Sequence, residues 1–174
     1  MFMQISTIIW LFPIVFMIHD FEEILLVRSW MDRNFETASR RIPRFLQKPA
    51  AQIKDISTAE FSLSVAVEFV FFSIIAFLAA EYGRYTLFNL FAVGLVAHSL
   101  VHLGTAIWTR SLAPGVVTSV LVLIPYGLLL FPRLTALGLI DWKTILIYLP
   151  VMLAVFGFYA YGLLWVGRKL LRKK

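Results

Sequence analysis

Two short patterns of histidine and glutamate stand out because their spacing suits metal binding. His19, Glu22 and Glu23 form an i, i+3, i+4 set, so in a helix they project from one face about one turn apart. His98 and His102 are four residues apart and share a helix face in the same way. Imidazole and carboxylate groups are ligands of zinc, iron and manganese. These patterns therefore indicate a metal site, provided that the helices carrying them come together.

The rest of the chain is apolar to a degree that soluble proteins do not reach. Of its 174 residues, 60% are hydrophobic and 15% are charged, with a mean hydropathy of +0.84, whereas a soluble domain is about 25% charged. The net charge of +6 does not indicate nucleic-acid binding, because Lys and Arg flank long apolar runs. The absence of cysteine excludes disulfides and thiolate metal ligands. The composition predicts an integral membrane protein.

Five apolar runs are long enough to cross a hydrocarbon core of about 30 Å. They cover residues 5–27, 57–80, 86–108, 115–131 and 143–166. We therefore expect an all-α fold, a polytopic membrane helix bundle of five transmembrane helices that forms one domain over residues 1–174. The fourth run contains Pro125, which predicts a bend in that helix.

The distribution of Lys and Arg predicts the orientation of the bundle. Thirteen basic residues lie on the side that carries residues 28–56 and the C-terminus, and three lie on the other side. Cytoplasmic loops carry the excess of Lys and Arg. We therefore expect a multi-pass protein of the cell inner membrane, with its N-terminus outside and its C-terminus in the cytoplasm.

The cytoplasmic segment over residues 28–56 is long enough for structure of its own. Between residues 35 and 46, apolar side chains recur at helical spacing with arginines between them. This pattern favours an interfacial helix on the anionic inner leaflet, bent at Pro43. An ordinary solvated loop that obeys the positive-inside rule is the alternative.

The depth of each polar group follows from the helical rise of about 1.5 Å per residue. His19 lies about 13 Å inward from Arg28, His102 about 12 Å inward from Arg110 and Glu68 about 20 Å inward from Asp55. The first three spans thus bring their polar groups into one slab in the cytoplasmic half of the membrane. A further acid, Glu60, follows Ser57 in the S-x-x-E pattern of a capping box, so we expect it to cap a helix and not to bind metal.

We predict that a divalent metal (zinc, iron or manganese) binds where these spans meet, and carboxylate bridging admits a second ion. The expected ligands are His19, Glu22, Glu68, His98 and His102. Glu23 is expected to act as a general base or to orient a ligand. Without a metal, the histidine pair would make an interhelical hydrogen bond, and each buried glutamate would pair with an arginine or a histidine.

The run His19-Asp20-Phe21-Glu22-Glu23 resembles the motif of the HXXEE-domain family of small bacterial membrane proteins. That family also carries a further histidine, which His98 or His102 would supply, and a Tyr-x-Pro-Gly motif. Here Leu112-Ala113-Pro114-Gly115 keeps the Pro-Gly pair and has leucine in place of tyrosine. A Pro-Gly pair fits a turn that opens the fourth span. The resemblance implies suspected enzymatic function and no particular reaction.

Three classes of function agree with these residues. A metal-dependent membrane enzyme would act on a lipid or small hydrophobic substrate at the cytoplasmic leaflet. A small carrier or channel would use the same side chains to relay protons or to bind a cation transiently. A structural or accessory subunit would use the network of histidine and glutamate to specify helix packing. The expected partners are the lipid bilayer and a lipid-like substrate, and not nucleic acid.

Overall fold

The computed structural model describes residues 3–40 and 54–171, and every regular element in these two ranges is helical. Their order is α1 (Ile5–Ser39), α3 (Thr58–Tyr82), α4 (Tyr85–Thr109), α5 (Val116–Thr118), the π-helix η1 (Ser119–Leu123), α6 (Ile124–Ala136) and α7 (Trp142–Leu171). The expected all-α class is therefore confirmed.

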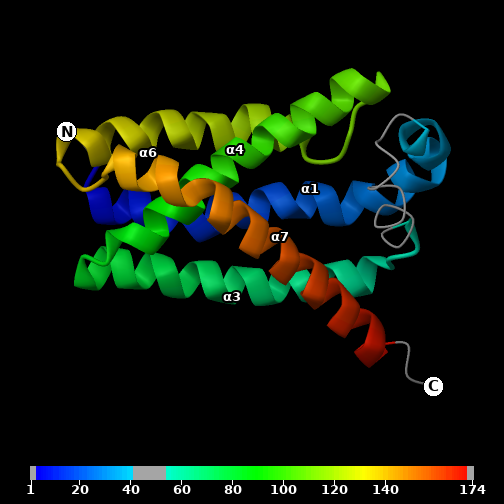
Figure 1. Cartoon of the computed structure of the whole chain (residues 1–174), viewed down its shortest axis with the longest axis horizontal. Helices are drawn as coiled ribbons and strands as arrows, with labels where there is room; N and C mark the ends of the chain where they lie inside the picture. Colours follow the sequence, from blue (N-terminus) through cyan, green and yellow to red (C-terminus); the bar gives the residue numbers. More distant parts are fainter. Residues whose placement is uncertain (1–2, 41–53, 172–174) are drawn as a thin grey trace.

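The long helices form a bundle whose members run back and forth along one axis (Figure 1). Helix α1 packs along α3, α4 contacts both of them, and α6 contacts α1 and α4. Helix α7 crosses the bundle obliquely in contact with α3 and α4. The described chain begins at one end of the bundle, with the start of α1, and finishes at the other, with the end of α7 (Figure 1).

Four helical stretches are long and apolar enough to cross a membrane: α3, α4, the continuous stretch Val116–Ala136 and α7. This agrees with the predicted membrane protein. Helix α1 is not among the four. It has the length, but it carries the acidic residues of the HXXEE-like motif near its middle and further charged residues beyond Arg28.

Helix α1 continues well past the predicted end of the first span. Residues 28–39 are its last three turns and not the start of a loop. No proline or glycine interrupts them, and Arg28 pairs with Asp32 one turn later at 3.1 Å, a spacing that favours the helix. The remainder of the predicted interfacial helix, including Pro43, lies in residues 41–53, outside the described part of the chain.

Local side-chain contacts define where α3 and α7 begin. The Ser57 hydroxyl accepts the backbone N–H of Glu60 at 3.2 Å, and the Glu60 carboxylate accepts that of Ser57 at 2.8 Å. The predicted capping box is thereby confirmed. Asp141 accepts the Thr144 hydroxyl at 2.6 Å and the backbone N–H of Lys143 at 3.0 Å. These hydrogen bonds, that of Thr144 foremost, lower the pKa of Asp141.

A bend is expected at Pro125; what the structure shows there is the π-helix η1, which ends two residues before the proline. A proline has no N–H to donate, and its ring clashes with the carbonyl one turn earlier in a regular α-helix. A wider π turn relieves this clash and turns the residues before it relative to α6. The first of these, Thr118, belongs to the site described below.

The core of the bundle is aromatic at the end that holds the N-terminus. Phe12 is fully buried, and its ring lies 5.1 Å from that of Phe72 and 5.3 Å from that of Phe88. The Tyr126 hydroxyl donates to the carbonyl of Ile8 at 3.2 Å. This end is therefore filled by side chains, and the histidines lie beyond it, toward the other end.

Candidate metal centre

Four side chains from two helices bring potential metal ligands together. Helix α1 supplies His19 and Glu23, and α4 supplies His98 and His102, each pair one turn apart. One donor atom from each of the four lies within 4.8 Å of all the others. His19 and His102 are buried, Glu23 is half-buried and His98 is exposed. Three imidazoles and one carboxylate are a donor set that suits zinc, iron or manganese.

The distances within this cluster agree with those around one ion. The Nε2 atoms of His19 and His102 lie 3.2 Å apart, and Nε2 of His102 lies 3.1 Å from Oε1 of Glu23. In a tetrahedral zinc site, bonds of about 2.0–2.1 Å place neighbouring ligand atoms about 3.3 Å apart. The spacing of these three atoms therefore fits ligands that share one metal.

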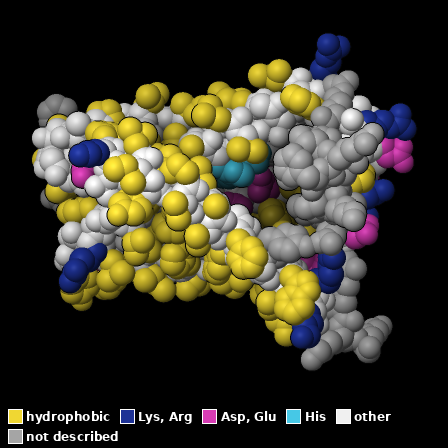
Figure 2. Space-filling model, in the orientation of Figure 1, with side chains coloured by type: hydrophobic (Ala, Val, Ile, Leu, Met, Phe, Trp, Pro, Cys, Tyr) yellow, Lys and Arg dark blue, Asp and Glu magenta, His cyan; other side chains and the backbone are white. Residues whose placement is uncertain are grey.

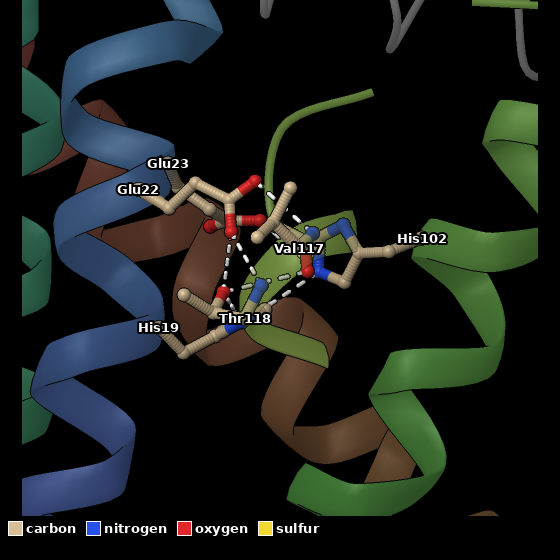
Figure 3. Close-up of polar contacts among 7 residues, drawn as sticks. His19, Glu22, Glu23, His102, Val117 and Thr118 are labelled. Carbon is tan, nitrogen blue, oxygen red and sulfur yellow. Dashed lines mark hydrogen bonds and ion pairs between the residues drawn. The ribbon is translucent and has the colours of Figure 1, made fainter. Parts of the chain in front are cut away.

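A threonine next to the π-helix orients His19. The Thr118 hydroxyl donates to Oε2 of Glu22 at 2.6 Å, and Nδ1 of His19 lies 2.9 Å from the same hydroxyl (Figure 3). Because the hydroxyl proton is directed at a carboxylate, its oxygen accepts from His19, which assigns the ring proton to Nδ1. Nε2 then has a free lone pair that points into the cluster. This is the outer arrangement typical of metal-binding histidines.

Glu22 is held by the start of the fourth apolar stretch. Its carboxylate accepts the backbone N–H of Thr118 at 2.7 Å and that of Val117 at 3.3 Å, in addition to the threonine hydroxyl (Figure 3). These donors belong to the first helical residues after Gly115, where backbone N–H groups lack partners within the helix. Glu22 thus connects α1 to α5 and does not reach the histidine cluster.

The Pro-Gly turn packs against His102. Gly115 has φ +80°, in the left-handed region that glycine adopts without strain. A Cβ placed on Gly115 would lie 2.6–2.9 Å from the imidazole of His102, so only glycine allows the ring to approach this closely. Leu112, at the position of the family tyrosine, is 66% exposed.

A cavity of about 220 Å³ opens beside the cluster, between α1, α3, α4 and α7. His19, Glu23 and His98 form part of its wall, together with Asp20 and Glu68. The remaining lining side chains are apolar: Phe16, Phe61, Val65, Phe72, Phe91, Leu95, Met152, Leu153 and Phe156, with Gly94 between them. Figure 2 shows histidine and acidic side chains at the bottom of a hollow in a largely apolar surface.

The structure brings together three of the five predicted ligands, His19, His98 and His102. The other two lie elsewhere: Glu22 is bonded to Thr118, and Glu68 lines the cavity outside the four-residue cluster. Glu23, predicted as a base or an orienting residue, takes the carboxylate position in the cluster. Sequence reasoning missed Thr118, because no periodicity links it to a histidine 99 positions away. Its only signal is its place just after the Pro-Gly turn.

Comparison with models of known protein families finds a family that matches the part of the chain containing the site. The family described as "protein of unknown function with HXXEE motif" matches residues 10–130, which is well over half of the chain. The chain belongs to the HXXEE family. The matched region of this HXXEE protein contains the whole histidine cluster, the Pro-Gly turn and Thr118, and it ends before α7. The comparisons with curated proteins and with solved structures each returned no match.

Proposed function

We propose that this HXXEE protein is a metal-dependent membrane enzyme that acts on a small hydrophobic or lipid-like substrate. The observation that carries the proposal is the position of four metal-binding donors beside an apolar cavity. A metal ligand set and a chamber for an apolar molecule are the two parts that such an enzyme needs.

The proposed ligands are His19, Glu23, His98 and His102, with one ion. In this assignment Glu23 is the carboxylate ligand and Glu22 the residue that orients a ligand, the reverse of what the sequence led us to expect. The reason is that the Glu22 carboxylate already accepts hydrogen bonds from the Thr118 hydroxyl and from the backbone N–H groups of Val117 and Thr118. A bound zinc, iron or manganese ion would supply Lewis-acid chemistry at a substrate oxygen.

The protein groups around the ion have separate tasks in this proposal. Thr118 and Glu22 hold the His19 ring with Nε2 directed inward. The phenylalanines of the cavity exclude water and orient an apolar substrate. Glu68 lies on the opposite helix, α3, and is placed to give or take a proton in the cavity.

We further propose that α1 crosses the membrane as the fifth span, with the N-terminus outside and the C-terminus in the cytoplasm. The support is the excess of Lys and Arg at the end of the bundle that carries residues 28–40 and the C-terminus. In this orientation the histidine cluster lies in the cytoplasmic half of the bilayer. A carrier is less well supported, because the aromatic core around Phe12 fills the other half.

The metal content of the purified protein tests the proposal. We expect about one zinc, iron or manganese ion per chain in detergent, as a single four-donor site requires. His98→Ala and Glu23→Gln should lose most of it, whereas Glu81→Gln, at the exposed end of α3, should keep it. A wild-type protein that binds none of these metals would overturn the proposal, and so would ligand variants that bind as much as wild type.

A further inference from the structure

The polar wall of the cavity carries only acidic and imidazole groups. Asp20, Glu23 and Glu68 contribute carboxylates, and His19 and His98 contribute rings. No lysine or arginine of the described residues lines the cavity. A ligand that enters therefore meets negative charge and no fixed positive charge from the protein.

Asp20 is the most unusual of these groups. It is only 6% exposed, yet it makes no hydrogen bond or ion pair within the described residues. Glu68, across the cavity, also lacks a hydrogen bond in this part of the chain. Glu22 and Glu23, on the same helix as Asp20, both have close partners. Because Asp20 lines the cavity and has no protein partner among the described residues, its carboxylate is available to a ligand that enters the cavity.

The charges near the cavity do not balance without such a ligand. In the proposed metal site, one divalent ion bound by Glu23 and three neutral imidazoles carries a net charge of +1. The ionised carboxylates of Asp20 and Glu68 together carry −2, so one negative charge is left without a counter-charge. A carboxylate in a membrane span is costly unless a cation or a proton neutralises it. Asp20 and Glu68 do not belong to the four-residue cluster that a single ion would hold. A cation that neutralises them would therefore be a second ligand of the cavity, separate from the metal ion.

The rest of the cavity suits an apolar chain with such a cation at its end. Phe61, Phe72, Phe91 and Phe156 line it, with Met152 from α7. These side chains would bury a hydrocarbon tail, at about 25 cal/mol per Å² of apolar surface removed from water. Aromatic ring faces also attract alkylammonium groups. The wall thus offers apolar contact along its length and negative charge next to the histidines.

We propose that the cavity binds lipophilic amines, with the ammonium group between Asp20 and Glu68 and the apolar tail along the phenylalanines. The inference rests on the proposed function, because it names the substrate class of the same site. It predicts a strong preference for a cationic head group over a neutral or an anionic one on the same tail.

Calorimetric binding of three ligands with one tail tests this preference. The ligands are octyltrimethylammonium, octan-1-ol and octanoate, titrated into the full-length protein in detergent at pH 7.5. The quaternary ammonium keeps its charge at every pH, so its binding does not depend on ligand protonation. We expect it to bind about 10–100-fold more tightly than octan-1-ol, the range for interactions with a charged group, and octanoate to bind most weakly.

Variants assign the preference to the two carboxylates. Asp20→Asn and Glu68→Gln should each bring the affinity for octyltrimethylammonium to within a few-fold of that for octan-1-ol, about what neutral hydrogen bonding leaves. Glu81→Gln is the matched control, because it removes one acidic charge from α3 at an exposed position. Each ligand partitions into the detergent to the same extent whichever variant is present, so this partition does not affect the comparison between variants.

The outcomes separate this inference from the metal proposal. Equal binding of all three ligands, or an ammonium preference that survives both variants, would overturn the amine inference. Metal content is measured on the same samples, so its absence would overturn the enzyme proposal independently. A loss of a second bound metal in Asp20→Asn would show that an ion occupies this position, and would also overturn the amine inference.

Discussion

At the scale of single residues, the site depends on how its histidines are held. The hydrogen bonds from Glu22 through Thr118 to His19 orient one ring, and the Pro-Gly turn packs on another, that of His102. In each contact only the histidine is a proposed metal ligand, and its partner, Thr118 or Gly115, is not. Each can therefore be removed by a substitution that leaves the four donors in place.

Thr118→Val is expected to weaken zinc binding by about 10–100-fold, the usual effect of losing a residue that orients a metal-binding histidine. Valine has the shape of threonine but offers no hydroxyl to Glu22 or to Nδ1 of His19. Competition with a chromophoric chelator measures the affinity. The absorption spectrum of the cobalt-loaded protein should also change, because the His19 ring turns.

Thr118→Ser provides the control for this change. It keeps the hydroxyl and loses only a methyl group, so its zinc affinity and cobalt spectrum should stay close to those of wild type. If the valine and serine variants behave alike, the hydroxyl does not orient His19 and the assigned tautomer is wrong.

Gly115→Ala is expected to damage both stability and zinc binding. The left-handed backbone costs alanine roughly 1–2 kcal/mol, and the added Cβ would press on the imidazole of His102. Gly138→Ala is the matched control, because Gly138 has φ +66° and a Cβ added there would meet no atom within 4 Å. Thermal melts should fall for both variants, whereas zinc affinity should fall only for Gly115→Ala. Equal zinc affinities would show that His102 does not need the turn.

At the scale of the elements, helix beginnings place the polar groups. Helix α3 starts at the capping box of Ser57 and Glu60, and this start sets how far along the bundle Glu68 lies. The π-helix before Pro125 has a similar effect on Thr118, because a wider turn changes the direction in which the preceding residues point. Local backbone chemistry thus determines where two cavity and site residues lie.

Ser57→Ala is expected to destabilise the protein by about 1 kcal/mol, the usual cost of losing a helix N-cap. The alanine leaves the backbone N–H of Glu60 without its acceptor. Ser62→Ala is the control, since Ser62 lies one turn later and its hydroxyl only donates to the carbonyl of Thr58 at 2.8 Å. Thermal melts in detergent compare the two. A melting temperature equally lowered in both variants would mean that the cap adds nothing.

At the scale of the whole molecule, the topology depends on whether α1 crosses the bilayer. The described helices place the two termini at opposite ends of the bundle (Figure 1). Four helical stretches meet the length and hydropathy requirements for a membrane span, and α1 is not one of them. Helix α1 packs along α3, which does meet them, and this packing supports a crossing by α1 as well. In the proposed topology α1 crosses the bilayer, with Gln4 outside and Arg110 in the cytoplasm.

Cysteine labelling resolves this topology, because the natural chain contains no cysteine. Gln4→Cys should react with a membrane-impermeant maleimide in intact cells, and Arg110→Cys only after lysis. The physical reason is the excess of Lys and Arg on the side of Arg110. Labelling of both positions from the same side would mean that α1 does not span the membrane.

The sequence alone determined the helical membrane class and the family motif, and it led to the expectation that the three histidines meet. Helical spacing places His98 and His102 on one face, and the chain has only three histidines to bring together. The capping box at Ser57 could also be predicted from the sequence, because it depends only on contacts within four consecutive residues. The membrane class, the motif and the capping box follow from composition or from local backbone geometry, whereas the contact of His19 with His102 was an expectation from their similar depths that the packing of α1 against α4 had to supply.

Only the tertiary structure decided between Glu22 and Glu23. Adjacent residues on a helix point about 100° apart, so the rotation of α1 about its own axis decides which of the two carboxylates faces α4. Its packing turns Glu23 to His102 and leaves Glu22 to the backbone N–H groups at the start of α5. The same packing turns Asp20 into the cavity. These choices depend on contacts between residues far apart in the chain, which no local pattern encodes.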